Sequence, residues 1–260
     1  MKNSLIKIRE FLKTKMFRPL LLMIGNRMGK YSTVGDLAIF DNNKFKWAKH
    51  LENNWLSIRN ELEGVLVFKH LLPNLQDIQQ EQKILNRDNN WKTFFLFGFG
   101  HKATMNCQLC PVTTAIIEQI PGMKTAFFSV LSPRKHIPAH KGIFKGIIRS
   151  HLGLIIPGNP GDCLMRIEKE HINWQEGKAV IFDDTYEHEV WNNTDEIRVV
   201  LLVDVKRPFK FPLSIINNAI ITLIGNSSHA GEAKKNHRLW ENNFYNKRTN
   251  IYTSALSPKL

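Results

Sequence analysis

The sequence predicts a mainly β core with flanking helices, arranged as a double-stranded β-helix of the jelly-roll, cupin-like kind. Three observations predict it: short β-rich runs at near-regular spacing, turn residues between them, and helical periodicity towards both ends of the chain. The 260 residues are 43% hydrophobic and 23% charged, a globular composition that excludes collagen-like and wholly disordered chains. The three cysteines are too few for a disulfide framework, which predicts a reducing, cytoplasmic location.

Two shifts of composition divide the chain into three parts. Residues 1–43 are expected to form basic amphipathic helices, with a break at Arg18-Pro19. Residues 44–208 are expected to form the double-stranded β-helix domain, including a helical N-terminal part, and residues 209–260 to form basic C-terminal helices. The N-terminal helices fit two interpretations, binding to a membrane surface or docking on the body of the chain.

The expected elements follow in chain order. Apolar residues at spacings of three and four predict a helix over 44–64 that packs into the core, and Cys110-Pro111 begins a short helix that ends at Ile120. Two further helices follow Arg207-Pro208, and the first has a wide apolar face closed by Gly225. The predicted strands are 91–97, 126–131, 147–156, 163–167, 179–182, 188–191 and 197–205.

The net charge of +13 is unevenly distributed. Residues 1–30 and 206–260 each carry +7, whereas residues 31–205 carry −1. A nucleic-acid-binding protein more often spreads its cations over the folded body, so no nucleic-acid partner is expected. Cationic ends on a near-neutral body indicate attraction to an anionic membrane surface, and hence a peripheral location on the inner face of the membrane. No apolar run is long enough to span a bilayer as a helix.

Two histidines distant in sequence, His140 and His188, are candidate metal ligands. Imidazole ligands with open coordination positions suit non-haem Fe(II), and the alternative is that both histidines are structural. Hairpin-type turn residues over 191–196 predict that strands 188–191 and 197–205 are antiparallel neighbours. That pairing would place Arg198 almost opposite His188, where it could anchor an acid that also reaches the metal.

Four longer motifs are more specific than these spacings. They are His-Leu-Gly-Leu (151–154), Trp-Gln-Glu-Gly-Lys (174–178), Phe-Asp-Asp-Thr-Tyr-Glu-His-Glu-Val-Trp (182–191) and Val-Asp-Val-Lys-Arg-Pro (203–208). Through them, residues 91–208 closely resemble the aspartyl/asparaginyl β-hydroxylase family of Fe(II)/2-oxoglutarate-dependent dioxygenases. That family also includes bacterial enzymes that hydroxylate acyl chains of lipid A, and its fold is a double-stranded β-helix.

The resemblance implies a set of ligands for Fe(II) and 2-oxoglutarate. His140 and His188 match the iron ligands. Arg198 matches the residue that pairs with the distal carboxylate of 2-oxoglutarate, Ser129 matches a helper at that carboxylate, and His151 matches another contact to the cosubstrate. The implied reaction consumes O₂ and hydroxylates a C–H bond of an organic substrate.

Two further residues have roles by resemblance or by position. Arg149 matches a cation on the substrate side of the site. Asp184 is expected either to act on the metal site, through a water or by orienting His188, or to be only a turn residue. Cys107 and Cys110 lack a second pair for a zinc site and are expected to be structural.

The sequence departs from family relatives at two places. Gly142 stands where many Fe(II) oxygenases carry a carboxylate ligand, although the peptide-hydroxylating branch lacks it too. Phe127 and Ile147 replace cations that would surround a substrate carboxylate, and burying a carboxylate against them is unfavourable. The predicted substrate is therefore a membrane lipid acyl chain. The alternatives are a peptide aspartyl/asparaginyl β-hydroxylase and a non-catalytic, membrane-associated binding protein on the same fold.

Overall fold

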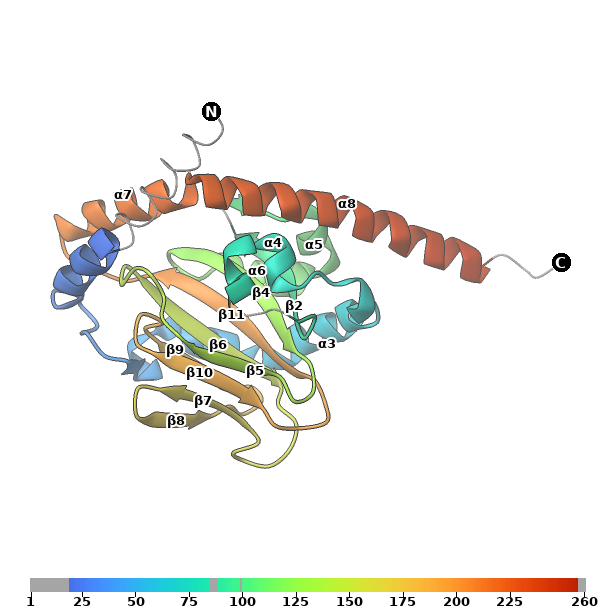
Figure 1. Cartoon of the computed structure of the whole chain (residues 1–260), viewed down its shortest axis with the longest axis horizontal. Coiled ribbons are helices and arrows are strands. Elements are labelled where there is room, and N and C mark those ends of the chain that lie inside the picture. Colours follow the sequence, from blue (N-terminus) through green and yellow to red (C-terminus); the bar gives the residue numbers. More distant parts are fainter. Residues whose placement is uncertain (1–18, 85–87, 99, 257–260) are drawn as a thin grey trace.

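Two antiparallel β-sheets face each other and enclose a barrel interior (Figure 1). The computed structural model describes residues 19–84, 88–98 and 100–256. In spatial order, the four-stranded sheet contains β5 (His136–His140), β10 (His188–Asn192), β7 (Cys163–Ile167) and β8 (Glu170–Asn173). The seven-stranded sheet contains, in order, β1 (Ile39–Phe40), β9 (Ala179–Phe182), β6 (Ile147–Ile155), β11 (Arg198–Lys206), β4 (Met123–Leu131), β2 (Trp91–Gly98) and β3 (His101–Lys102). The predicted jelly-roll fold class, a mainly β core with flanking helices, is confirmed.

Helices cover the outer face of the seven-stranded sheet. These are α2 (Lys46–Asn53), α3 (Trp55–Leu66), α5 (Thr104–Leu109) and α6 (Pro111–Glu118), with the 3-10 turns η1 (Asn42–Lys44) and η2 (Lys69–Leu71). The short helix α4 (Leu75–Ile78), followed by the 3-10 turn η3 (Gln80–Ile84), contributes Leu75 and Ile78 to the apolar cluster that includes the barrel interior. The C-terminal helices α7 (Leu213–Gly225) and α8 (Ser228–Leu256) run along the top of the view in Figure 1. Phe244 of α8 packs against Phe68 and Phe94, so the C-terminal helix contributes to the main core.

The seven-stranded sheet is buried on both faces, which explains its nearly continuous apolar runs. On β4, Phe128 and Val130 point outwards into the core shared with the helices. Phe127 and Leu131 point inwards to the barrel interior, where the four-stranded sheet closes over them. Polar residues on this inner face are therefore unusual, and they mark the candidate site.

The structure differs from the expected elements in several places. The predicted helix over 44–64 is two helices, α2 and α3, that meet at Asn54, and α3 continues past Gly64 to Leu66. Strands β1, β3, β5 and β8 and the short helices α4 and α5 were not expected. β5 contains Pro138, which a strand tolerates at a sheet edge, and β5 is the edge of the four-stranded sheet.

The predicted hairpin between strands 188–191 and 197–205 is wrong. β10 pairs with β5 and β7, whereas β11 pairs with β4 and β6 in the other sheet. The side-chain amide of Asn192 donates to the carbonyl oxygens of Ser132 and Glu196, at 2.9 and 2.8 Å. The turn residues thus stabilise a corner that carries the chain from one sheet to the other, and the tight two-strand turn does not form.

The division of the chain into residues 1–43, 44–208 and 209–260 stays a prediction. Residues 1–18, and with them most of the predicted N-terminal helices, lie outside the described residues. Residues 19–29 form a helix, as expected for this part of the chain. Within the described ranges, no helix combines the length and the apolar character needed to cross a bilayer.

Candidate active site

Two histidines from adjacent strands form the centre of the candidate site. His140 on β5 and His188 on β10 are directly opposed in the strand register, and their ring centroids lie 4.0 Å apart. Each Nδ1 lies near the backbone carbonyl oxygen two residues earlier, at 2.8 Å from Pro138 and 3.0 Å from Tyr186. When each Nδ1–H donates to its carbonyl, the Nε2 lone pair of each ring stays free.

This arrangement fits a transition metal. Burial lowers the pKa of both histidines to about 4, and the neighbouring His188 adds to the effect at His140, so both rings are neutral near pH 7. A neutral imidazole whose other nitrogen donates to a carbonyl is the form that binds metals in proteins. No group of three or more His, Cys, Asp and Glu side chains suited to a metal occurs among the described residues.

Asp184 occupies the space next to Gly142. A Cβ atom added at Gly142 would lie 2.3 Å from the Oδ1 atom of Asp184, and the Gly142 N–H donates to the Asp184 carbonyl oxygen at 2.6 Å. Burial raises the pKa of the Asp184 carboxyl group, although the Arg149 guanidinium opposes this shift. Gly142 stands where many Fe(II) oxygenases carry a carboxylate ligand. Because it has no side chain, it leaves room for the carboxylate of Asp184 instead.

Arg198 is a buried cation that faces the barrel interior. Its residue is 1% exposed, its Nε has no hydrogen-bond partner, and its Cζ lies 3.9 Å from the ring centre of Trp174. Burial lowers the pKa of its guanidinium to about 9. No carboxylate forms an ion pair with Arg198 within the part of the chain that the structure describes. A buried guanidinium in this state is suited to an anionic ligand.

Ser129 and His151 lie on the same inner face as Arg198. Ser129 Oγ accepts a hydrogen bond from Trp91 Nε1 at 3.0 Å. Both ring nitrogens of His151 are buried without a partner, and burial, followed by the nearby Arg198, lowers its pKa well below the ordinary value. The Phe182 ring connects the two parts of the site: its centroid lies 5.0 Å from that of His151 and 5.6 Å from that of His188.

Arg149, the expected substrate-side cation, is held by two carboxylates. Its Nε and Nη2 donate to Asp204 at 2.8 and 3.0 Å, and its Nη1 lies 3.1 Å from Asp184 Oδ2. Burial opposes the charge of Arg149, but the two carboxylates outweigh it and raise the pKa of the guanidinium. The three charges sum to −1, so this cluster presents no free cation to a substrate carboxylate.

The structure thus brings the predicted residues together at the barrel interior, but not by the expected pairing. Arg198 and His188 face the interior from different sheets instead of lying opposite each other on neighbouring strands. Sequence reasoning assigned no role to Trp174, Trp91 or Asp204. Trp174 and Asp204 do lie within the two motifs at 174–178 and 203–208. Trp91 has no comparable sequence signal, because its role depends on a contact with a separate strand.

Comparisons with known proteins identify the family. The profile of the Aspartyl/Asparaginyl beta-hydroxylase family matches residues 52–208, more than half of the chain. The chain belongs to the aspartyl/asparaginyl β-hydroxylase family. A relative from Rhizobium tropici, named ornithine lipid ester-linked acyl 2-hydroxylase, is 44% identical over 233 residues, which are 89% of this chain and 83% of that protein. The family predicted from the motifs is therefore confirmed, and the protein is a hydroxylase.

Mammalian members of the family match a smaller part of this chain than the Rhizobium tropici relative does. The aspartyl/asparaginyl beta-hydroxylases of Mus musculus and Homo sapiens are 31% and 30% identical over 208 residues, 71% of this chain in both cases. This hydroxylase spans only about a quarter of each of them, 27% and 26%.

Proposed function

We propose that this hydroxylase is an Fe(II)/2-oxoglutarate-dependent dioxygenase that hydroxylates an acyl chain of a membrane lipid. The observation that supports it most is the pair of neutral imidazoles, His140 and His188, facing a barrel interior that also contains the unpaired Arg198 guanidinium. Bound Fe(II) with 2-oxoglutarate and O₂ supplies the oxidation of a C–H bond, while 2-oxoglutarate is converted to succinate and CO₂.

The residues around Arg198 suit one end of a dicarboxylate. A guanidinium can donate two parallel hydrogen bonds to a carboxylate, and the Ser129 hydroxyl can donate to a remaining lone pair. The Trp174 ring packs against the guanidinium plane, which holds it in one orientation. His151 is neutral and has two buried, unpartnered nitrogens, so one ring N–H is available to donate to the bound cosubstrate.

The surroundings of Arg149 support an apolar target. A substrate carboxylate there would meet Asp184 and Asp204 before it met an unpaired cation, and the resulting repulsion is unfavourable in a buried site. Phe127 and Ile147 also line the inner face. In this role Arg149 positions Asp184 beside the metal site on the substrate side. The Rhizobium tropici relative, whose name specifies a lipid acyl chain, supports the same substrate class.

The proposed location of the hydroxylase is the cytoplasmic face of a membrane. The two cationic ends of the chain favour a peripheral position on an anionic membrane surface, and the three buried free thiols fit the cytoplasmic face of that membrane. Burial raises the pKa of Cys107 and Cys110, which supports a structural role for both. Nothing in the site favours a nucleic acid as a partner.

Two alternatives are separated from the proposal by specific observations. A peptide aspartyl/asparaginyl β-hydroxylase is favoured by the names of the mammalian relatives and opposed by the neutralised Arg149. A non-catalytic binding protein is favoured by Gly142 and opposed by two histidines that both keep Nε2 free. Incubation with an ornithine-containing lipid and with an aspartate-containing peptide separates them, since only the true substrate gains one oxygen atom.

Succinate formation tests the metal assignment directly. With Fe(II) and 2-oxoglutarate supplied, His140→Ala and His188→Ala are each expected to reduce succinate formation by at least about a hundredfold, since each removes a ligand. His136→Ala is the matched control, because His136 lies on the same strand but is exposed and stacks on Trp191. If both ligand variants turn over like the control, the metal assignment is wrong.

A further inference from the structure

Helix α7 exposes large apolar side chains to solvent. Its thirteen residues contain no charged side chain, and the one residue that it buries is the polar Asn217. Ile215, Ile216 and Leu223 are 59%, 43% and 63% exposed. A helix that packs on its own domain normally buries its apolar stripe, whereas α7 only half-buries Ile220, Ile221 and Ile224 and leaves other large apolar side chains exposed.

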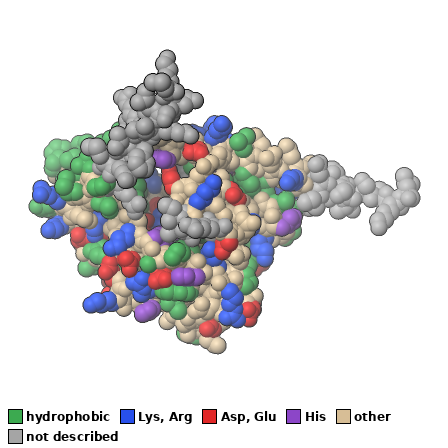
Figure 2. All heavy atoms as spheres, viewed as in Figure 1, with side chains coloured by type: hydrophobic (Ala, Val, Ile, Leu, Met, Phe, Trp, Pro, Cys, Tyr) green, Lys and Arg blue, Asp and Glu red, His purple; other side chains and the backbone are tan. Residues whose placement is uncertain are grey.

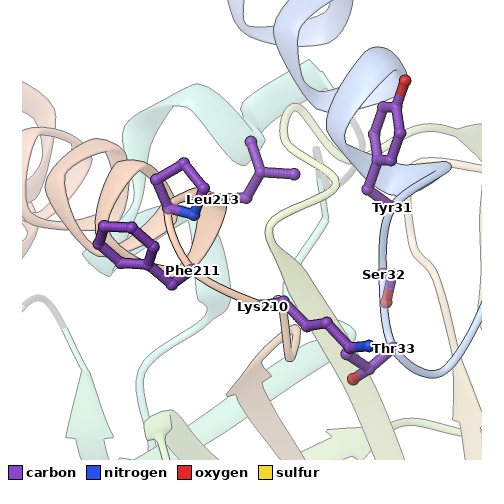
Figure 3. Close-up of a pocket in the computed structure, with 7 residues that line it drawn as sticks. Tyr31, Ser32, Thr33, Lys210, Phe211 and Leu213 are labelled. Carbon is purple, nitrogen blue, oxygen red and sulfur yellow. The ribbon is translucent and has the colours of Figure 1, made fainter.

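The exposed apolar surface continues beyond α7. Tyr31 and Phe211 are 70% and 80% exposed and lie on opposite sides of a surface pocket (Figure 3). The Thr33 N–H donates to the Pro208 carbonyl oxygen at 3.1 Å, which holds these two distant segments together. Figure 2 shows hydrophobic side chains gathered over the place that α7 occupies in Figure 1. We define the docking face by its exposed residues: Leu20, Met23, Tyr31, Phe211, Ile215, Ile216 and Leu223.

The charged residues in the two segments that form the docking face are all basic. The segments 19–35 and 206–231 contain no Asp or Glu. They contain five basic residues, of which Arg207 is neutralised by the buried Asp183. Basic residues around exposed aliphatic and aromatic side chains are typical of helices that lie in the interface of an anionic bilayer. At 1.5 Å per residue, α7 is about 20 Å long, too short to span the hydrocarbon core.

The docking face lies next to the loop that connects β5 to β6, at the end of the barrel where β11 finishes. β11 runs from the buried Arg198 to Lys206, which pairs with Ile147 at the start of β6. The Asn217 side chain donates to the carbonyl oxygen of Gly146 at 3.0 Å. Gly146 ends the loop that begins directly after the candidate ligand His140. The helix at 19–29 reaches the same loop, because a Cβ added at Gly25 would lie 3.0 Å from the Lys145 nitrogen.

We propose that the docking face inserts into the interface of an anionic bilayer and presents the loop 141–146, and with it the barrel entrance, to the lipid. Acyl chains then reach the site from the membrane side without crossing water. The inference rests on the proposed function for its substrate, but the attachment itself does not depend on catalysis.

Vesicle binding of the metal-free full-length protein tests the surface. We expect binding to vesicles of phosphatidylglycerol and phosphatidylethanolamine, weaker binding to phosphatidylcholine, and a decrease with rising salt. The triple variant Phe211→Gln/Ile215→Gln/Leu223→Gln should lose roughly tenfold or more in vesicle partitioning. The matched control, Leu56→Gln/Val67→Gln/Val112→Gln, changes side chains on α3, directly after α3 and on α6 that are 59%, 69% and 47% exposed, and it should bind like the wild type.

Two outcomes contradict the proposal. Either the triple variant binds vesicles like the wild type, which includes the case in which it only dissociates a dimer, or the control variant loses as much vesicle binding as the triple variant. Turnover of the same lipid in detergent micelles separates this inference from the proposed function. Wild-type turnover in micelles without vesicle binding overturns the docking face alone, whereas vesicle binding without any turnover overturns the proposed function alone.

Discussion

At the scale of single residues, the candidate site is defined by what its side chains lack. His140 and His188 each use Nδ1 on a nearby carbonyl and keep Nε2 free, while Arg198 is buried without a described carboxylate. Gly142 lacks the side chain that would collide with Asp184. Leaving buried polar atoms without partners is unfavourable for folding, so the unpartnered nitrogens of His151 and Arg198 on one inner face indicate a place for a ligand.

Replacing Gly142 tests the role of this empty space. Gly142→Asp restores the sequence of a carboxylate-containing iron site, yet it should weaken iron binding, because the new side chain meets the Asp184 carboxylate. Gly142→Ala should lower the free energy of unfolding by about 1–3 kcal/mol through the same collision. Denaturant unfolding and iron titration measure both effects. Gly64→Ala is the control, since no atom lies within 4 Å of its added Cβ, and stronger iron binding by Gly142→Asp would contradict the prediction.

Arg198→Lys tests the proposed anion site. Lysine keeps a positive charge but loses the paired donors and the flat contact with Trp174. We expect the 2-oxoglutarate concentration at half-maximal turnover to rise by about tenfold or more, with a smaller change in kcat. Arg166→Lys changes an arginine on β7 that is paired with Glu189, and it should leave the 2-oxoglutarate dependence unchanged. An unchanged dependence in Arg198→Lys would remove this assignment.

At the scale of secondary-structure elements, α8 is attached to the body through a buried histidine. His237 is fully buried, and its ring centroid lies 5.9 Å from Phe95 and 5.7 Å from His101. Burial, together with the smaller effect of the neighbouring His101, lowers the pKa of His237 to about 4. The ring is therefore neutral in the folded protein near pH 7, and its protonation opposes the docking of α8.

The sign of the resulting pH dependence follows from this lowered pKa. Between the ordinary value of 6.5 and about 4, the unfolded chain binds more protons at His237 than the folded chain does, so stability falls as the pH falls through this range. His237→Gln should reduce the loss of unfolding free energy between pH 7 and pH 4 by about 3 kcal/mol at most. Urea unfolding of the wild type and the variant at pH 7 and pH 4 measures this difference in unfolding free energy. The exposed His171 on β8 is the control position, and an equal effect of His171→Gln would contradict the prediction.

At the scale of the whole molecule, one carboxylate connects distant parts of the chain. Asp183 is fully buried and pairs with Arg207 after β11 and with Lys145 in the loop after β5. The Thr185 hydroxyl donates to its other oxygen at 2.6 Å, and Lys145 also pairs with Asp36 near the N-terminal segment. Asp183 thus links the segment after β11 to the loop next to the site and, through Lys145, to Asp36.

Removing this carboxylate charge should be strongly destabilising. Asp183→Asn removes the fully buried carboxylate that Lys145 and Arg207 share and leaves them only the partly exposed Asp36, and we expect a loss of about 3–5 kcal/mol in the free energy of unfolding. Asp195→Asn removes the partner of Arg134 in an exposed ion pair. This change should alter the free energy of unfolding by no more than about 1 kcal/mol. Urea denaturation compares the two, and similar losses in both variants would show that Asp183 has no special role.

The sequence predicted the fold class and most strands, because strands buried on two faces are apolar throughout and turns are marked by Gly, Pro and Asn. It did not predict β5, whose exposed residues and Pro138 are typical of a loop. It also misassigned the turn after Trp191, since Asn192 reaches carbonyls far along the chain. The neutralisation of Arg149 depends on Asp204 across a strand pair, a register that one sequence does not specify.

The direct opposition of His140 and His188 has a mechanical consequence. β5 is an edge strand, and its pairing with β10 is irregular between His188 and Val190. An ion shared by the two rings would cross-link this edge to its neighbour, so metal affinity and strand attachment are thermodynamically coupled. Loading the protein with a redox-inert divalent ion should therefore slow amide hydrogen exchange along β5 more than anywhere else in the sheet.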